Sequence, residues 1–160
     1  MHRLGSIKHL AGLALVVAIA AAAGAIASPA LAAEPTKTLS LTIASSKLGS
    51  IIVDGDGYTI YMFRPDARNV SNCEGQCLTA WPPVKLGKGE TLANVATSAG
   101  LRRSLLGVAM REDGSRQVTY DGRPLYWWFQ DTKAGDLKGQ WVNNAWWVMD
   151  DQGTPVLTHL

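Results

Sequence analysis

The sequence YMFRPD at residues 61–66 returns as YWWFQD at residues 126–131. Each copy has a Tyr, an aromatic residue two positions later, and an Asp three positions after that. The same 65-residue offset pairs Val53 with Val118, Asp56-Gly57 with Asp121-Gly122, and Trp81 with Trp146. So many matches at one spacing predict an internal duplication, with repeats at about 50–84 and 115–149.

The first 32 residues have the three parts of a secretory signal peptide. Residues 2–9 include the basic side chains of His2, Arg3, Lys8 and His9, and residues 10–27 form an apolar run rich in Ala. Ala30-Leu31-Ala32 then offers small residues to a signal peptidase. We expect cleavage after about Ala32, and a single mature domain of residues 33–160 in the periplasm or outside the cell. The alternative is an uncleaved anchor, because 18 apolar residues are just long enough to cross a bilayer. The Ala-rich composition and the cleavage site favour removal, so no stable membrane insertion is expected.

The charge of the predicted mature chain is balanced. Without Arg3 and Lys8, the mature chain has 13 Lys and Arg residues and 13 Asp and Glu residues. A net charge near zero provides no field that would attract nucleic acid. His159 is the single His after residue 32, which argues against a His-rich metal site and against His-dependent catalysis. No cofactor is expected.

Alternating apolar residues and turn signals predict an all-β fold. Residues 38–44 alternate, and residues 51–53 and 58–63 flank an Asp-Gly-Asp-Gly turn at 54–57. Further strands are expected at 107–112, 117–120, 125–129 and 145–149. The mature chain contains no amphipathic helical pattern of ten residues. We therefore predict a compact antiparallel sandwich or barrel-like domain built from two homologous repeats.

Cys73 and Cys77 are the two cysteines of the chain. An exported protein meets an oxidising compartment, so we expect them to form a structural disulfide. Ser71 and Glu74 fit a capping box, which predicts a short helical turn around the pair. The alternative is a copper- or thiol-handling site that uses both cysteines, with His159 or a Met as a third ligand.

The repeated motif is predicted to be structural. Residues two apart on a strand face the same side, which pairs Tyr61 with Phe63, and Tyr126 with Trp128. We expect these aromatic pairs to lie in the core. Asp66 and Asp131 follow the strands, where a carboxylate can accept backbone N–H bonds and hold a turn. The alternative is a hydrolase in which these two Asp residues act as general acid and base.

Adjacent Trp residues on predicted strands must place their rings on opposite faces. If one face is the core, Trp127 and one ring of the Trp146-Trp147 pair point outward. Exposed aromatic groups bind sugars, aromatic compounds or proteins. The possible binding platform comprises Met62, Trp127, Trp141, Trp146 and Trp147. The alternative is that both faces are covered.

Four motifs resemble those of a known family: G-x-x-x-Y-x-F-x-x-D at 57–66, S-x-C-x-G-x-C at 71–77, WPP at 81–83, and Q-x-T-Y-x-G-x-P-L-Y at 117–126. They resemble the bacterial secreted-repeat proteins, predicted lipoproteins that share a Y-x-(F/W/Y)-x-x-D motif. The resemblance covers about residues 47–150 and implies an extracytoplasmic, all-β, two-repeat protein with no assigned catalytic residue. This chain departs from it in two ways. It has no Cys before Cys73 to carry a lipid, and Trp141 stands where a Gly is expected.

These observations favour a non-enzymatic extracytoplasmic binding or envelope-interaction module. The expected partner is a small molecule, a glycan or an envelope protein. The copper- or thiol-handling protein and the hydrolase are the two alternatives.

Overall fold

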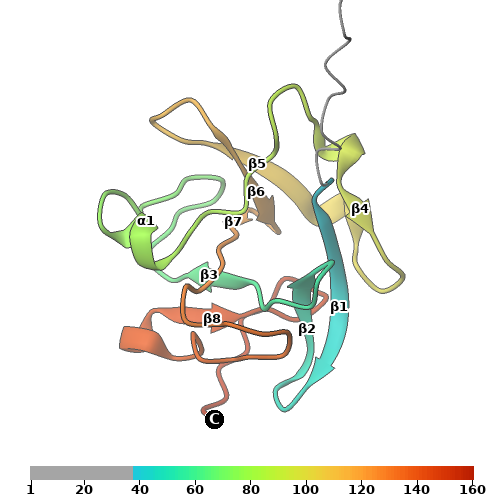
Figure 1. The fold of residues 1–160 in the computed structure, drawn as a ribbon, viewed down its shortest axis with the longest axis vertical. Coiled ribbons are helices and arrows are strands. Elements are labelled where there is room, and N and C mark those ends of the chain that lie inside the picture. The colour runs from blue at the N-terminus through green and yellow to red at the C-terminus, as the bar shows by residue number, and fades with distance from the viewer. Residues whose placement is uncertain (1–37) are drawn as a thin grey trace, which may run out of the picture. The chain divides into compact units, whose positions relative to one another are not determined.

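The structure is a computed structural model that describes residues 38–160. The predicted signal peptide lies outside the described residues. Among the regular elements of the described residues, strands predominate (Figure 1), and the one α-helix, α1, has four residues. No helix among the described residues has the length and hydropathy needed to cross a membrane.

The two repeats share an antiparallel hairpin and a short helix at equivalent positions. The first contributes β1 (Ser40–Ser46), β2 (Gly49–Asp54), β3 (Tyr61–Phe63) and α1 (Cys77–Ala80). The connection carries two 3-10 helices and one strand: η1 (Leu92–Asn94), β4 (Ala96–Thr97) and η2 (Arg103–Leu105). The second repeat contributes β5 (Leu106–Met110), β6 (Arg116–Tyr120), β7 (Arg123–Pro124), the 3-10 helix η3 (Val142–Asn144) and β8 (Trp146–Val148). Helix α1 and helix η3 begin at equivalent positions of the duplication, whereas β3, β7 and β8 have no counterpart strand.

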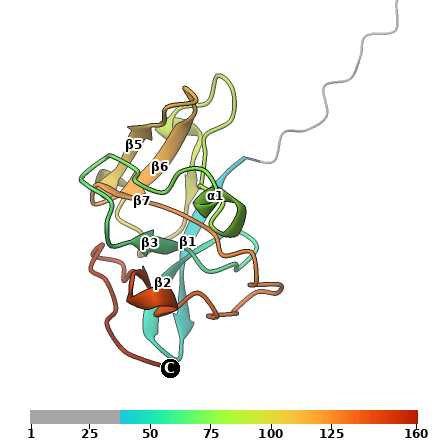
Figure 2. The same ribbon diagram turned by 90° about the vertical axis from the view of Figure 1, so that its left-hand side faces the viewer.

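The strands form three small sheets, ordered β2-β1-β4, β3-β8 and β5-β6-β7. Each repeat begins with an antiparallel hairpin, β1–β2 or β5–β6, and the connection adds β4 parallel to β1. The β5-β6-β7 sheet lies towards one end of the described unit and the β1–β2 hairpin towards the other, with β3 between them (Figures 1 and 2). The prediction of an all-β fold with two repeats is confirmed.

Two details of the local prediction are wrong. The segment at 125–129 is not a regular strand, because Tyr126 makes isolated bridges to Tyr61 and Pro83 instead of a ladder. The short helix begins at Cys77, and its first turn has no side-chain cap. Ser71 does not cap a helix, because its hydroxyl is used in tertiary hydrogen bonds.

The interior contains two clusters of apolar side chains, one on each face of the β3–β8 pair. Met62 and Trp147 lie in the first cluster, and Tyr61 and Trp146 lie in the second. Strand alternation places neighbouring side chains on opposite faces, and here both faces are covered. The expectation that Met62, or one ring of the Trp146-Trp147 pair, points outward is therefore wrong: all three side chains are buried.

Candidate functional site

The two motif tyrosines meet at the centre of the molecule. The backbone N–H of Tyr61 donates to the carbonyl oxygen of Tyr126 at 2.8 Å, and the N–H of Tyr126 donates back to the carbonyl oxygen of Tyr61 at 2.9 Å. Both side chains are fully buried. This exchange relates the two motifs by an approximate two-fold rotation, and we call the contact the repeat axis.

The tyrosine hydroxyls cross the repeat axis. Tyr61 Oη donates to Asp131 Oδ2 at 2.7 Å, and Tyr126 Oη donates to Asp66 Oδ2 at 2.8 Å. Each motif Tyr therefore binds the Asp of the other repeat. Equivalent residues of the duplication make equivalent bonds, and neither repeat can make them alone.

The second oxygen of each motif carboxylate holds its own turn. Asp66 Oδ1 accepts the N–H of Asn72 at 2.7 Å, and Asp131 Oδ1 accepts the N–H of Lys138 at 3.0 Å. The structure thus places both carboxylates where the sequence predicted, after the motif segment and on backbone N–H groups. The bonds to the opposite tyrosines are an additional use that the sequence did not indicate.

Burial changes the acidity of these groups. It raises the pKa of Asp66 to about 6, against the lowering effect of hydrogen bonds from Asn72 and Tyr126. Burial also raises the pKa of Asp131, and it raises the pKa of Tyr61 and Tyr126 so that both remain protonated donors. Both carboxylates are already engaged by a phenol and a backbone N–H. Nothing in their contacts marks one as an acid and the other as a base.

Four aromatic rings form a stack across the repeat axis. Trp81 and Trp146 lie parallel at its centre, with ring centroids 3.7 Å apart and planes 4° from parallel. Phe63 packs on the outer face of Trp146 at 4.2 Å, and Trp128 packs on Trp81 at 4.0 Å. Phe63 and Trp128 are equivalent residues of the two motifs, so the stack repeats the symmetry of the hydrogen bonds.

The disulfide predicted between Cys73 and Cys77 is present. Beside it lies a buried cation that the sequence did not mark. Arg111 pairs with Glu74 at 2.6 Å and donates to the carbonyl oxygen of Cys73 at 2.7 Å. It also donates to Gln117 Oε1 at 2.6 Å. Nothing in the sequence marked Arg111, which follows strand β5 and opens an ordinary hairpin turn.

The structure offers no support for the metal alternative. Both sulfur atoms are in the disulfide, and His159 stacks on Trp141 with ring centroids 3.8 Å apart. Within residues 38–160, no group of three or more His, Cys, Asp or Glu side chains could hold a metal ion.

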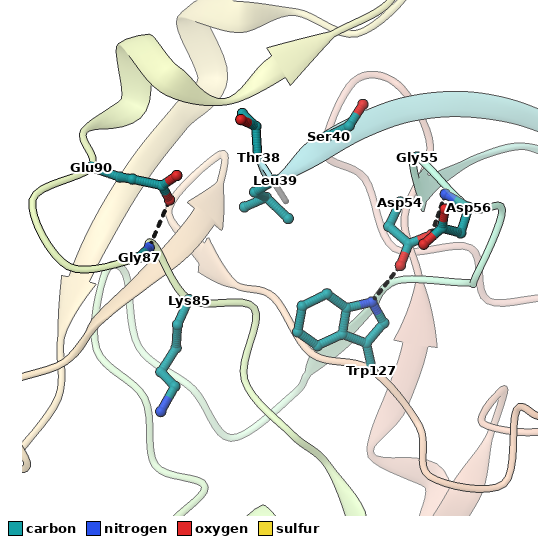
Figure 3. A pocket seen from close by; sticks show the side chains of 10 residues that line it. All are labelled: Thr38, Leu39, Ser40, Asp54, Gly55, Asp56, Lys85, Gly87, Glu90 and Trp127. Atoms are coloured by element: carbon teal, nitrogen blue, oxygen red, sulfur yellow. Dashed lines mark hydrogen bonds between the residues drawn. The ribbon is translucent and has the colours of Figure 1, made fainter. Parts of the chain in front are cut away.

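A pocket of about 350 Å³ lies beside Trp127 (Figure 3). Its lining comes from three chain segments and the ring: Thr38, Leu39, Ser40, Asp54, Gly55, Asp56, Lys85, Gly87, Glu90 and Trp127. The indole Nε1 of Trp127 donates to Asp54 Oδ2 at 3.0 Å. Asp54 Oδ1 in turn accepts the backbone N–H groups of Asp56 and Tyr58, at 2.9 Å each. The turn at 54–57 therefore fixes the ring through one carboxylate.

In the other half of the duplication, the region that corresponds to the pocket is occupied by protein atoms. Met62, the counterpart of Trp127, is buried. Tyr120 Oη accepts the N–H of Arg102 at 2.9 Å and donates to the carbonyl oxygen of Asp151 at 2.8 Å, which ties the final turn against β6. A Cβ placed on Gly153 would lie only 2.6 Å from the Cβ of Asp121. The pocket thus has no open counterpart at this place.

Of the predicted platform, Trp127 and Trp141 are half-buried, as expected for rings that reach the surface. Trp127 lines the pocket, whereas Trp141 does not. Of the five side chains combined in the predicted platform, Trp127 is the one that lines this pocket, and the binding platform itself stays a prediction.

Comparison with known proteins places the repeats in one family. Residues 42–85 and 107–150 both match a family described as a secreted repeat of unknown function. The two matched segments stand at the same offset as the repeated motif, and together they cover more than half of the chain. No curated protein and no solved structure matches the chain. The chain belongs to the family of secreted repeats of unknown function.

Proposed function

We propose that this protein is a non-enzymatic binding module that works outside the cytoplasm and holds a small ligand in the Trp127 pocket. The observation that carries the proposal is the break in repeat symmetry at Trp127. A half-buried indole lines a pocket there, whereas the equivalent Met62 is covered. The description of the family as secreted supports the location.

The lining of the pocket favours binding over catalysis. Asp54 accepts three N–H hydrogen bonds, from Asp56, Tyr58 and Trp127. Glu90 Oε2 accepts the N–H of Gly87 at 2.7 Å (Figure 3). Hydrogen bonds of this kind hold the carboxylates in fixed positions in the pocket lining. A fixed aromatic ring in a concave pocket is typical of small-molecule sites. The lining includes no Cys or His, and the carboxylates of Asp54 and Glu90 are already engaged by N–H donors.

The proposal can be tested through the indole N–H signals in a ¹⁵N-correlated NMR spectrum. Mixtures of saccharides, amines, organic acids and aromatic compounds would be added to the protein in turn. We expect one class of compound to shift the signal of Trp127, with the buried Trp146 and Trp147 signals unchanged.

A Trp127→Phe variant assigns the signal, and Trp141→Phe serves as the matched control, because Trp141 is also half-buried but lies outside the pocket. The proposal fails if no mixture moves the Trp127 signal, or if the compounds that bind shift only other indoles.

A further inference from the structure

Each central ring of the aromatic stack also touches a motif tyrosine. Tyr61 packs edge-on against Trp81, with ring centroids 5.4 Å apart. Tyr126 packs edge-on against Trp146 in the same way, at 5.1 Å. Because each tyrosine hydroxyl donates to a carboxylate across the repeat axis, a path of direct contacts runs from the indoles through a phenol to a carboxylate. The duplication makes this path twice.

The central indoles are arranged to share a positive charge. Indoles and phenols lose a single electron more readily than other ring side chains, and an indole that has lost one is a cation. The face of a second indole attracts a cation that lies against it. Trp81 and Trp146 lie face to face at 3.7 Å, so each can stabilise the oxidised form of the other. The negative charges of Asp66 and Asp131, bonded to the two tyrosines, favour the same form.

The motif carboxylates can take the proton that an oxidised phenol releases. A phenol is oxidised easily only when a base within hydrogen-bond reach accepts its proton as the electron leaves. Asp131 Oδ2 lies 2.7 Å from the hydroxyl of Tyr61, and Asp66 Oδ2 lies 2.8 Å from that of Tyr126. Burial raises the pKa of both carboxyl groups, which makes them stronger bases than an exposed carboxylate.

Trp128 connects the aromatic stack to the surface. The ring is half-buried and packs on Trp81 at 4.0 Å. Its indole Nε1 is buried and has no hydrogen-bond partner among the described residues. An oxidised Trp128 therefore lacks an acceptor in residues 38–160 for its N–H proton. Because loss of that proton is what holds the charge on one indole, the charge stays free to pass to Trp81.

We propose that the repeat axis is a redox-active site that takes up single oxidising equivalents, whether or not the Trp127 pocket holds a ligand. A diffusible one-electron oxidant, such as an inorganic radical, removes an electron from Trp128, and the stacked rings replace it in turn. One motif tyrosine then gives an electron to the stack and its hydroxyl proton to the partner carboxylate, which leaves a neutral tyrosyl radical beside a neutral carboxyl group. A small one-electron reductant restores the phenol as the carboxyl group returns the proton.

The test generates azide radicals in a solution of the protein by pulse radiolysis, because these radicals oxidise indoles rapidly. Optical absorption follows the indole and tyrosyl radicals separately. We expect the indole radical to decay as the tyrosyl radical appears, at a rate that does not depend on protein concentration. The step should be slower in D₂O, since the phenol proton moves with the electron. Decay of the indole radical without a tyrosyl radical, or equal rates in the two solvents, would overturn the proposal.

Two double variants locate the radical among the four tyrosines of the chain. Tyr61→Phe/Tyr126→Phe removes both phenols of the repeat axis and should abolish the tyrosyl signal. Tyr58→Phe/Tyr120→Phe is the matched control. Its hydroxyls donate to backbone carbonyl oxygens, which are much weaker bases than carboxylates, so the signal should match that of the wild type. A tyrosyl signal that survives in the first variant and is lost in the second contradicts the assignment.

A third double variant tests the proton acceptors. Asp66→Asn/Asp131→Asn keeps both phenols, but an amide is so weak a base that the transfer should slow at least about tenfold. Trp141→Phe, outside the aromatic stack, should leave the rate unchanged. An unchanged rate in the Asn variant means that the carboxylates do not take the proton, and the proposal fails. Circular dichroism checks that each variant is folded, and for any that is not, the solvent isotope comparison on the wild type decides.

Discussion

The repeat axis and the Trp127 pocket both involve residues of the duplicated sequence. Equivalent residues have equivalent contacts at the axis but different environments at the pocket. At the axis, equivalent residues make equivalent bonds, as in the two Tyr–Asp pairs and the Trp81–Trp146 stack. At the pocket, equivalent positions hold Trp127 and Met62, one half-buried and the other buried.

The difference follows from what each position touches. A residue on the axis contacts the other repeat, so a change in one copy removes the partner of the other and leaves a buried polar group unpaired. Trp127 also contacts the other repeat, because its indole N–H donates to Asp54, but this bond has no equivalent in the other half, where Met62 and Thr119 stand at the corresponding positions. A change at Trp127 therefore breaks no bond that has a counterpart across the axis, and the two positions can differ.

The largest test of this contrast concerns the aromatic stack. Trp81→Ala and Trp146→Ala should each lower the free energy of unfolding by about 3–5 kcal/mol, as for other large aromatic side chains removed from a core. Trp127→Ala should cost clearly less, because that ring is half-buried. Urea unfolding followed by circular dichroism measures all three. If Trp81→Ala and Trp146→Ala lower the free energy of unfolding by widely different amounts, the two halves of the stack are not energetically equivalent.

A second test removes one hydroxyl at a time from the repeat axis. Tyr61→Phe takes the donor from Asp131, and Tyr126→Phe takes it from Asp66. Each change should lower the free energy of unfolding by about 1.5–3 kcal/mol, the range for hydrogen bonds to charged groups. Tyr58→Phe is the control, because its hydroxyl makes only a long 3.5 Å contact to a carbonyl oxygen. An effect no larger than that of Tyr58→Phe would mean that the crossed bonds do not hold the repeats together.

A third test concerns a feature of the first repeat alone. The positions equivalent to Cys73 and Cys77 are Lys138 and Val142, so the second repeat forms its corresponding turn without a bridge. The double variant Cys73→Ser/Cys77→Ser should lose about 2 kcal/mol, the chain-entropy value for so short a loop. Thiol titration of the exported, denatured wild-type protein should find no free thiol. Two free thiols would revive the copper- or thiol-handling alternative.

The smallest effect is a dependence on pH. The pKa of Asp66 is about 6 in the folded protein and about 3.9 in an unfolded chain, so the folded state binds this proton more tightly. The contribution of Asp66 to the free energy of unfolding should therefore rise as pH falls from about 7 to about 4 and then level off. Because Asp66 is partly exposed, we expect this contribution to stay below about 1 kcal/mol. Urea melts of the wild type and Asp66→Asn across this range measure it, and identical slopes would contradict the assignment.

The sequence predicted the equivalence of the repeats, the hairpins and the disulfide, because these depend on local pattern or on residue type. It could not predict that Tyr61 bonds to Asp131, since an offset says which residues correspond and not whether they touch. Strand alternation correctly separated Trp146 from Trp147. It could not say that both faces are covered, because covering depends on segments far away in the chain. Arg111 was missed for the same reason: its partners come from another part of the chain.

The crossed Tyr–Asp bonds also have a consequence for a single repeat made on its own. Such a polypeptide would have no partner for its Tyr hydroxyl or its Asp carboxylate, and one face of its central Trp would be exposed. We therefore expect an isolated repeat to fold only as a homodimer that shares one interior. In the present chain the segment between α1 and β5 joins the two copies, so corresponding positions can hold different residues, as Met62 and Trp127 do.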